Sequence, residues 1–216
     1  MKKIFLVIIA LTAVSLACGL PNIIGTPAPQ PTSNILFADD FSTPDSGWAR
    51  LTETDKSADY VNGGYRMWLN IAQYDIWSYT GKTFTDPVSI EVDATKTAGP
   101  DDNDFGVICN FQDSDNFYFG LISSDGYALI GKKEGGTTTP LSADQMVPVD
   151  GIQSGSQANH IKFVCDNGTL SLFANGFPLA TATDTTFTSG DVGLRIGTYA
   201  EAGLEVVFDN FVVLRP

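Results

Sequence analysis

Two Asn-Gly dipeptides constrain the fold of this chain more than any other feature. Asn167-Gly168 and Asn175-Gly176 each lie between short runs of apolar and β-branched residues. An Asn-Gly turn suits two consecutive residues with positive φ, and between apolar runs it is the strongest short-range signal for a β-hairpin. The sequence therefore predicts a three-stranded antiparallel meander over residues 160–182.

The rest of the chain from Ile35 onward shows the same strand-like pattern. In one run, Val88, Ile90 and Val92 alternate with polar residues, and hardly any segment has a convincing helical period. We count about a dozen strands, which is too many for one flat sheet. The prediction is an all-β fold of two packed antiparallel sheets in a jelly-roll sandwich, with residues 134–158 as a long surface excursion.

Composition narrows the classes of partner. Twelve basic against 25 acidic residues give a formal net charge of −13, so a nucleic-acid backbone is excluded as a natural partner. A hydrophobic content of 43% that is spread along the chain excludes disorder over most of its length.

The N-terminus has the features of an export signal. Lys2 and Lys3 precede an apolar run, Ile4–Val14, that is shorter than the ~18 residues a membrane span needs. Ala17-Cys18-Gly19 resembles the bacterial lipoprotein signal, in which the cysteine is acylated and becomes the mature N-terminus. This resemblance implies a signal peptide over residues 1–17 and a lipid on Cys18. A general secretory peptide cleaved near Ala17 is the alternative.

The segment after Cys18 suits a spacer. Residues 18–34 are rich in proline and small polar residues, a composition typical of an extended, semi-rigid tether. We therefore expect a globular domain over residues 35–216 that is exported and held at a bacterial membrane by the lipid alone, facing outside the cytoplasm.

The remaining cysteines form an even pair. Cys109 shares an apolar strand face with Phe105, Val107 and Phe111, and Cys165 shares one with Ile161 and Phe163. An oxidising compartment favours a disulfide between them. Two separate buried thiols are the alternative.

Several motifs, in this order along the chain, resemble bacterial members of the concanavalin A-like lectin/glucanase superfamily. The resemblance covers residues 35–215 and implies a laminin-G-like jelly roll with a general preference for glycans. Its segments are Ile35–Ser42 with Ser46-Gly47-Trp48, Asn62–Arg66, Asp104–Cys109 followed by Asp115–Tyr118, Leu172–Gly176 and Phe208–Phe211.

The sequence offers no evident catalytic group. Glucanases of this superfamily carry an E-x-D-x-x-E strand, but Glu91 and Asp93 are followed by no second glutamate and suit a solvated strand face. His160 is the single histidine and has no nucleophile motif beside it. The Asp-rich segments 101–104 and 113–116 suit turn capping.

A structural calcium site is the one cofactor hypothesis. Related glucanases and binding modules hold calcium between their first and last strands, and the resemblance places Asp209 there. Its partner is Asp39 or Asp40, and alternation favours Asp40, because Phe37, Asp39 and Phe41 share the face expected to point to the core. The alternative is that Asp209 only hydrogen-bonds the opening turn.

Two tryptophan-containing strands are candidates for sugar stacking. Arg66, Trp68 and Asn70 share one strand face, and Asp75, Trp77 and Tyr79 share another. Sugars present apolar C–H faces that stack on aromatic rings, with polar groups beside them for the hydroxyls. The two strands would together form one concave platform; alternatively, both tryptophans belong to the core.

The function expected from these observations is non-catalytic binding of an oligo- or polysaccharide by a lipid-anchored module. A glycoside-acting enzyme of the same superfamily and a structural or protein-contact module of a surface complex are the alternatives.

Overall fold

The predicted meander forms as three consecutive hairpin strands. In the computed structural model, which describes residues 34–216, β12 (Asn159–Asp166), β13 (Thr169–Ala174) and β14 (Phe177–Thr183) pair antiparallel in sequence order. All four residues of the two Asn-Gly turns have positive φ, between 47° and 84°. The predicted signal peptide, Cys18 and all but the last residue of the predicted tether lie outside the described residues.

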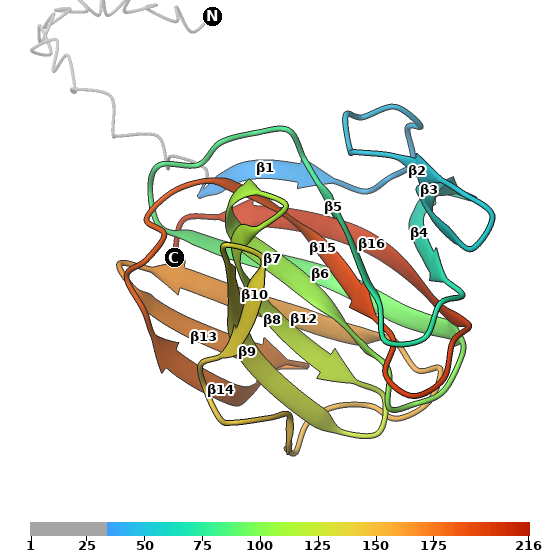
Figure 1. Ribbon diagram of the computed structural model, residues 1–216. Helices are drawn as coiled ribbons and strands as arrows, with labels where there is room; N and C mark the ends of the chain where they lie inside the picture. Colours follow the sequence, from blue (N-terminus) through green and yellow to red (C-terminus); the bar gives the residue numbers. More distant parts are fainter. Residues whose placement is uncertain (1–33) are drawn as a thin grey trace, which may run out of the picture. The chain divides into compact units, whose positions relative to one another are not determined.

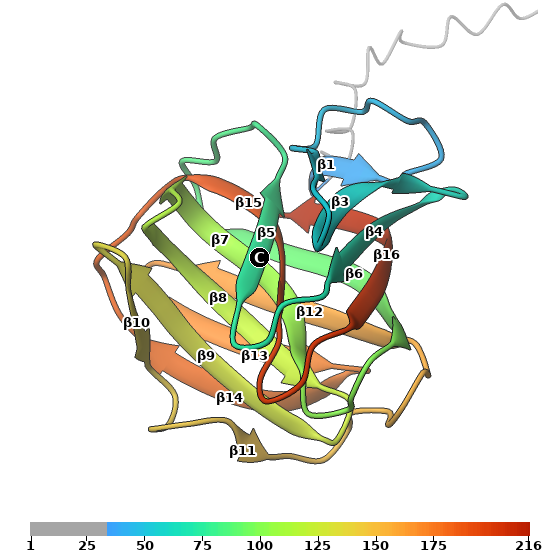
Figure 2. The same ribbon diagram turned by 45° about the vertical axis from the view of Figure 1, so that its right-hand side comes forward.

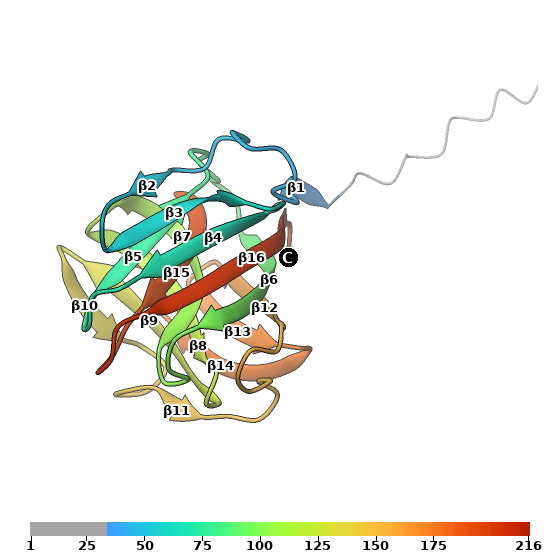
Figure 3. The same cartoon turned by 90° about the vertical axis from the view of Figure 1, so that its right-hand side faces the viewer.

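The strands of the described chain form two antiparallel sheets (Figure 1). The nine-stranded sheet, which faces the viewer in Figure 3, has the order β14-β13-β12-β6-β16-β4-β3-β2, with β1 paired to β16. Its further strands are β1 (Ile35–Asp39), β2 (Leu51–Thr52), β3 (Lys56–Val61), β4 (Gly64–Leu69), β6 (Val88–Ala98) and β16 (Leu204–Leu214).

The seven-stranded sheet, seen in Figure 2, has the order β10-β9-β8-β7-β15-β5, with β11 paired to β9. Its strands are β5 (Asp75–Tyr79), β7 (Asp104–Asp113), β8 (Asn116–Ser123), β9 (Tyr127–Glu134), β10 (Thr137–Pro140), β11 (Val147–Pro148) and β15 (Asp191–Gly197). The prediction of an all-β jelly roll of two sheets is confirmed. Residues 34–216 contain no helix that is long and apolar enough to cross a membrane.

The described chain has sixteen strands rather than about a dozen. Two of the additional strands, β10 and β11, lie inside residues 134–158, where the sequence shows no alternation. All four β10 residues are exposed, so no buried face imposes a period of two there. Both strands pair with β9 only, and the predicted excursion is therefore partly an extension of the sheet.

The core lies between the sheets and is crossed by a disulfide. Cys109 of β7 and Cys165 of β12 are joined, which is the pair expected from the sequence. The face assigned to Phe111 was wrong, because Asn110 has φ 51° and the β7–β8 register shifts beyond Cys109. This bulge turns Phe111 to the opposite face of the sheet.

Candidate functional site

The outer face of the seven-stranded sheet carries a second apolar cluster, separate from the core. Successive side chains of a strand point to opposite faces of the sheet. In this sheet, the residues that lie between core residues along each strand therefore point to the outer face. We call this set the outer-face cluster: Ile108, Phe117, Phe119, Leu121 and Leu129, with Trp77, Phe111 and Met146 packed against them.

Side chains from both margins of the sheet meet over its outer face. The ring centroids of Trp77 on β5 and Phe117 on β8 are 5.4 Å apart, and the Lys133 Nζ of β9 lies 4.5 Å from the Trp77 ring centroid. Strands β5 and β9 are separated by three others, or about 19 Å in a flat sheet. The contact therefore requires the sheet to curve with this face concave.

The middle of the concave face is filled rather than open. Phe117, Phe119 and Leu121 are each no more than 2% exposed. Tyr79 and Phe111 stack with ring centroids 4.6 Å apart. These side chains would block a long ligand that lay across all the strands. Space for a ligand therefore has to lie at an end of the face, beyond the filled middle.

A row of charged residues crosses β5, β15 and β7 at one end of the outer face. Asp75, Gly197 and Asp104 are register partners on β5, β15 and β7. Arg195, which is only 6% exposed, contacts Asp75 at 2.8 Å and Asp104 at 3.3 Å. A side chain at position 197 would collide with both carboxylates, since its Cβ would lie 2.5 Å from Asp75 Oδ1 and 2.8 Å from Asp104 Oδ1.

This row holds more negative than positive charge. Burial raises the pKa of Asp104 above its ordinary value, Arg195 acts to lower it, and the charge on Asp75 adds to the rise. One guanidinium thus pairs with two carboxylates, and its attraction does not fully offset the rise in the pKa of Asp104 that burial causes.

A cavity of about 280 Å³ opens beside this row. Two exposed tyrosines, Tyr127 and Tyr199, stand at it, with 37% and 66% of their surfaces accessible. Asn103, which is fully buried, accepts a hydrogen bond from the Tyr199 backbone N–H at 2.8 Å and so fixes that loop. The other lining residues are Asp102, Asp104, Ser123, Asp125, Gln145 and Met146.

The single platform predicted from Trp68 and Trp77 does not form. Their strands, β4 and β5, belong to different sheets, so the two tryptophans lie on opposite outer faces of the sandwich. Both rings are partly exposed and neither lies in the core between the sheets, where Met67, Leu69 and Ile76 are buried instead. Arg66 and Asn70 accompany Trp68, whereas Asp75 and Tyr79 accompany Trp77.

The side chains proposed for calcium serve other contacts. The Asp40 carboxylate accepts hydrogen bonds from the Ser42 backbone N–H and hydroxyl, and Asp209 accepts one from the Asn210 N–H. The neighbouring Asp39 accepts from the Trp48 ring N–H at 3.0 Å and from the Ser46 hydroxyl.

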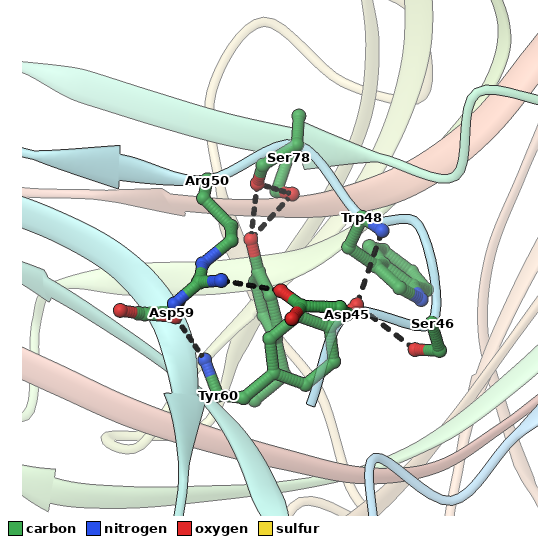
Figure 4. A network of polar contacts seen from close by, with 9 residues as sticks. Asp45, Ser46, Trp48, Arg50, Asp59, Tyr60 and Ser78 are labelled. Carbon is green, nitrogen blue, oxygen red and sulfur yellow. Dashed lines mark hydrogen bonds and ion pairs between the residues drawn. The ribbon is translucent and has the colours of Figure 1, made fainter. Parts of the chain in front are cut away.

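The loop that follows β1 and contains Trp48 takes part in the polar network of Figure 4, in which Arg50 reaches Asp45 and Asp59. Within residues 34–216, no group of three or more His, Cys, Asp or Glu side chains is placed to hold a metal ion. A site built from one or two carboxylates and backbone carbonyls is not addressed by this finding, and calcium binding stays an untested prediction.

The acidic face of β6 is part of a charged surface. His160 Nδ1 lies 2.8 Å from Asp93 and its Nε2 lies 3.5 Å from Glu91, while Lys162 contacts Glu91 at 3.2 Å. A cross-strand hydrogen bond to Asp93 and the Lys162–Glu91 ion pair account for the placement of these side chains.

Many solved structures share the fold of the described residues. No protein-family model and no curated protein matches the sequence. The carbohydrate binding module CBM66 from Bacillus subtilis is similar with TM-score 0.60 and 18% identity, over 78% of this chain and 95% of that one. A galectin-like protein of unknown function from Bacillus subtilis has TM-score 0.60 and 15% identity, over 84% and 97%.

A β-glucanase from Bacillus licheniformis is similar with TM-score 0.59 and 13% identity, over 83% of this chain and 97% of that one. At such identities the likeness shows the fold alone. The described domain has the galectin-like, concanavalin A-like jelly roll that the sequence motifs resemble.

Sequence reasoning missed Arg195 and the cavity. The available signal was the β15 sequence, where Gly193, Arg195 and Gly197 alternate with buried Val, Leu and Ile residues. Glycines on both sides of an arginine leave space around it on its own face of the strand, while Val, Leu and Ile fill the other face. Such an arginine indicates a charged group that is paired on a sheet face, because arginine is rarely buried unpaired.

Proposed function

We propose that this chain is an exported, lipid-anchored, non-catalytic protein that binds a glycan at the cavity of the seven-stranded sheet. The observation that carries this proposal is the cavity itself, where the exposed rings of Tyr127 and Tyr199 stand beside polar side chains. Aromatic faces with a few convergent polar groups are the usual composition of a sugar site. The presence of a carbohydrate-binding module among the structures of the same fold supports the proposal.

Export and anchoring rest on separate observations. The Cys109–Cys165 disulfide suits an oxidising compartment. The anchor rests on the sequence alone, on the resemblance of Ala17-Cys18-Gly19 to a lipoprotein signal.

Replacing Cys18 by serine tests the anchor. We expect Cys18→Ser to move the protein from the detergent phase to the aqueous phase in a phase-partition experiment, because the lipid supplies the membrane affinity. Its circular dichroism should match the wild type. Retention of the variant in the detergent phase would contradict lipidation of Cys18.

Truncation of the two tyrosines tests glycan binding. On a polysaccharide and oligosaccharide panel, we expect Tyr127→Ala and Tyr199→Ala to weaken retention about tenfold or more, because each removes a stacking surface worth on the order of 1.4 kcal/mol. Trp68→Ala and Phe177→Ala are matched controls, since both are accessible aromatic residues on strands of the other sheet and neither lines the cavity. If these controls weaken binding as much as the tyrosine variants, the site is elsewhere.

A glycoside hydrolase is the second candidate function. The Oδ1 atoms of Asp75 and Asp104 lie 2.5 Å and 2.8 Å from the point that a Cβ at position 197 would occupy. The two oxygens are therefore no farther apart than the sum of these distances. That separation is compatible with the ~5–5.5 Å between the carboxyl groups of retaining glycosidases. Against it, both carboxylates are already paired with Arg195, so neither is free to act on a glycosidic bond or its water. Release of shortened glycans by the wild type, abolished in Asp104→Asn, would establish the enzyme and exclude the binding module.

A further inference from the structure

The cavity beside Tyr127 and Tyr199 differs in charge from a site for a neutral sugar. Three of its lining residues are aspartates, and no lysine, arginine or histidine lines it. Of the three aspartates only Asp104 has a cationic partner, Arg195, which it shares with Asp75. The cavity therefore faces an excess of negative charge.

The three aspartates differ in what they already bind. Asp104 has Arg195, and Asp125 accepts a hydrogen bond from the Ser123 hydroxyl. Asp102 is exposed, and within residues 34–216 its carboxylate has no hydrogen-bond or ion-pair partner. An ionised carboxylate can only accept hydrogen bonds, so a ligand here must bring donors.

The aromatic part of the lining favours a cation independently of the aspartates. No hydrogen bond involves the Tyr127 or Tyr199 hydroxyl within the described residues, and both rings are accessible. The face of a tyrosine ring attracts an ammonium group through its quadrupole, and cages of aromatic rings recognise alkylammonium ligands. An ammonium group also supplies three hydrogen-bond donors, which suits a carboxylate-rich wall.

We propose that this cavity binds an amino sugar whose amine is free and protonated, with the sugar ring against the tyrosines and the ammonium group toward Asp102 and Asp125. This inference rests on the proposed glycan-binding function and names its ligand class. A volume of about 280 Å³ is near the lower end of small-molecule pockets, so the site takes one sugar residue rather than a chain segment.

The test compares two trisaccharides that differ only in acetylation. Binding of the glucosamine trimer and of its fully N-acetylated form to the full chain is measured by calorimetry near pH 6, where the amine is protonated. We expect the free amine to bind at least tenfold more tightly. Asp102→Asn and Asp125→Asn should each reduce this preference, while Tyr199→Ala should weaken binding of both sugars.

Asp86→Asn is the matched control for general attraction to an acidic protein. Asp86 is exposed and lines a different pocket, together with Asn110, which lies six residues along β7 from Asp104. Equal loss of amine preference in Asp86→Asn and Asp102→Asn would overturn the inference, because the preference would then follow net charge.

The remaining outcomes separate this inference from the proposed function. Equal binding of the two trisaccharides, still sensitive to Tyr199→Ala, overturns the amino-sugar specificity and leaves glycan binding intact. Binding of ethanolamine as tight as that of the glucosamine trimer shows that the sugar ring is not recognised and overturns the inference. Binding of no glycan, here or on the panel, overturns both.

Discussion

Reduction of the Cys109–Cys165 disulfide is expected to lower the free energy of unfolding by roughly 4 kcal/mol. The bond closes a loop with a sequence separation of 56 residues. In the chain-entropy model, releasing such a loop in the unfolded state costs between the ~3 kcal/mol of a 15-residue loop and the ~4.7 kcal/mol of a 100-residue loop. Urea unfolding of the full chain carrying Cys18→Ser, with and without a phosphine reductant, measures the difference.

The double variant Cys109→Ala/Cys165→Ala separates the bond from the reductant. Its unfolding midpoint should not change when the reductant is added, because it has no disulfide to lose. Both sulfurs lie in the core, so this variant also loses buried side-chain volume. Its unfolding with the reductant is therefore compared only with its own unfolding without the reductant. Labelling of Cys109 or Cys165 by a thiol reagent in the denatured, unreduced protein would show that the bond is absent.

The disulfide and the meander were predictable because their signals are local. Asn-Gly turns fix the hairpin type within two residues, and alternation places each cysteine on a face. The same rule failed for Phe111, because the positive φ of Asn110 inserts a bulge. An asparagine within an apolar run is compatible with a regular strand and with a bulge, so the pattern does not distinguish them.

The candidate site was less predictable because it is assembled from distant strands. Trp68 and Trp77 are close in sequence, but residues 70–74 carry the chain from one sheet to the other. Conversely, Asp104 and Arg195 are 91 residues apart and become neighbours only through the pairing of β7 with β15. Local periodicity gives the face on which a side chain lies, whereas sheet order decides which faces adjoin.

Replacement of Arg195 by methionine is expected to lower the free energy of unfolding by about 3–5 kcal/mol at pH 7. Methionine retains an unbranched chain over the Phe119 ring, whose centroid lies 4.7 Å from the guanidinium carbon. It removes the cation shared by Asp75 and Asp104. The Asp104 carboxylate, which is 22% exposed, is then a largely buried charge without its partner, and such a charge carries this penalty. Arg50→Met is the matched control, because Arg50 also pairs with two aspartates but is 47% exposed, and we expect it to leave the free energy of unfolding nearly unchanged.

The pH dependence of the Arg195→Met variant identifies the cause of its instability. Burial already raises the pKa of Asp104, and losing Arg195 raises it further. A carboxyl group with a raised folded-state pKa binds protons more readily in the folded than in the unfolded protein, so its stability deficit shrinks as pH falls from 7 toward about 4. Adding Asp75→Asn and Asp104→Asn should restore much of the lost stability at pH 7, because no unpaired charge then remains. A deficit that is the same at both pH values and persists in the triple variant would mean that Arg195 stabilises the fold through packing and not through its two ion pairs.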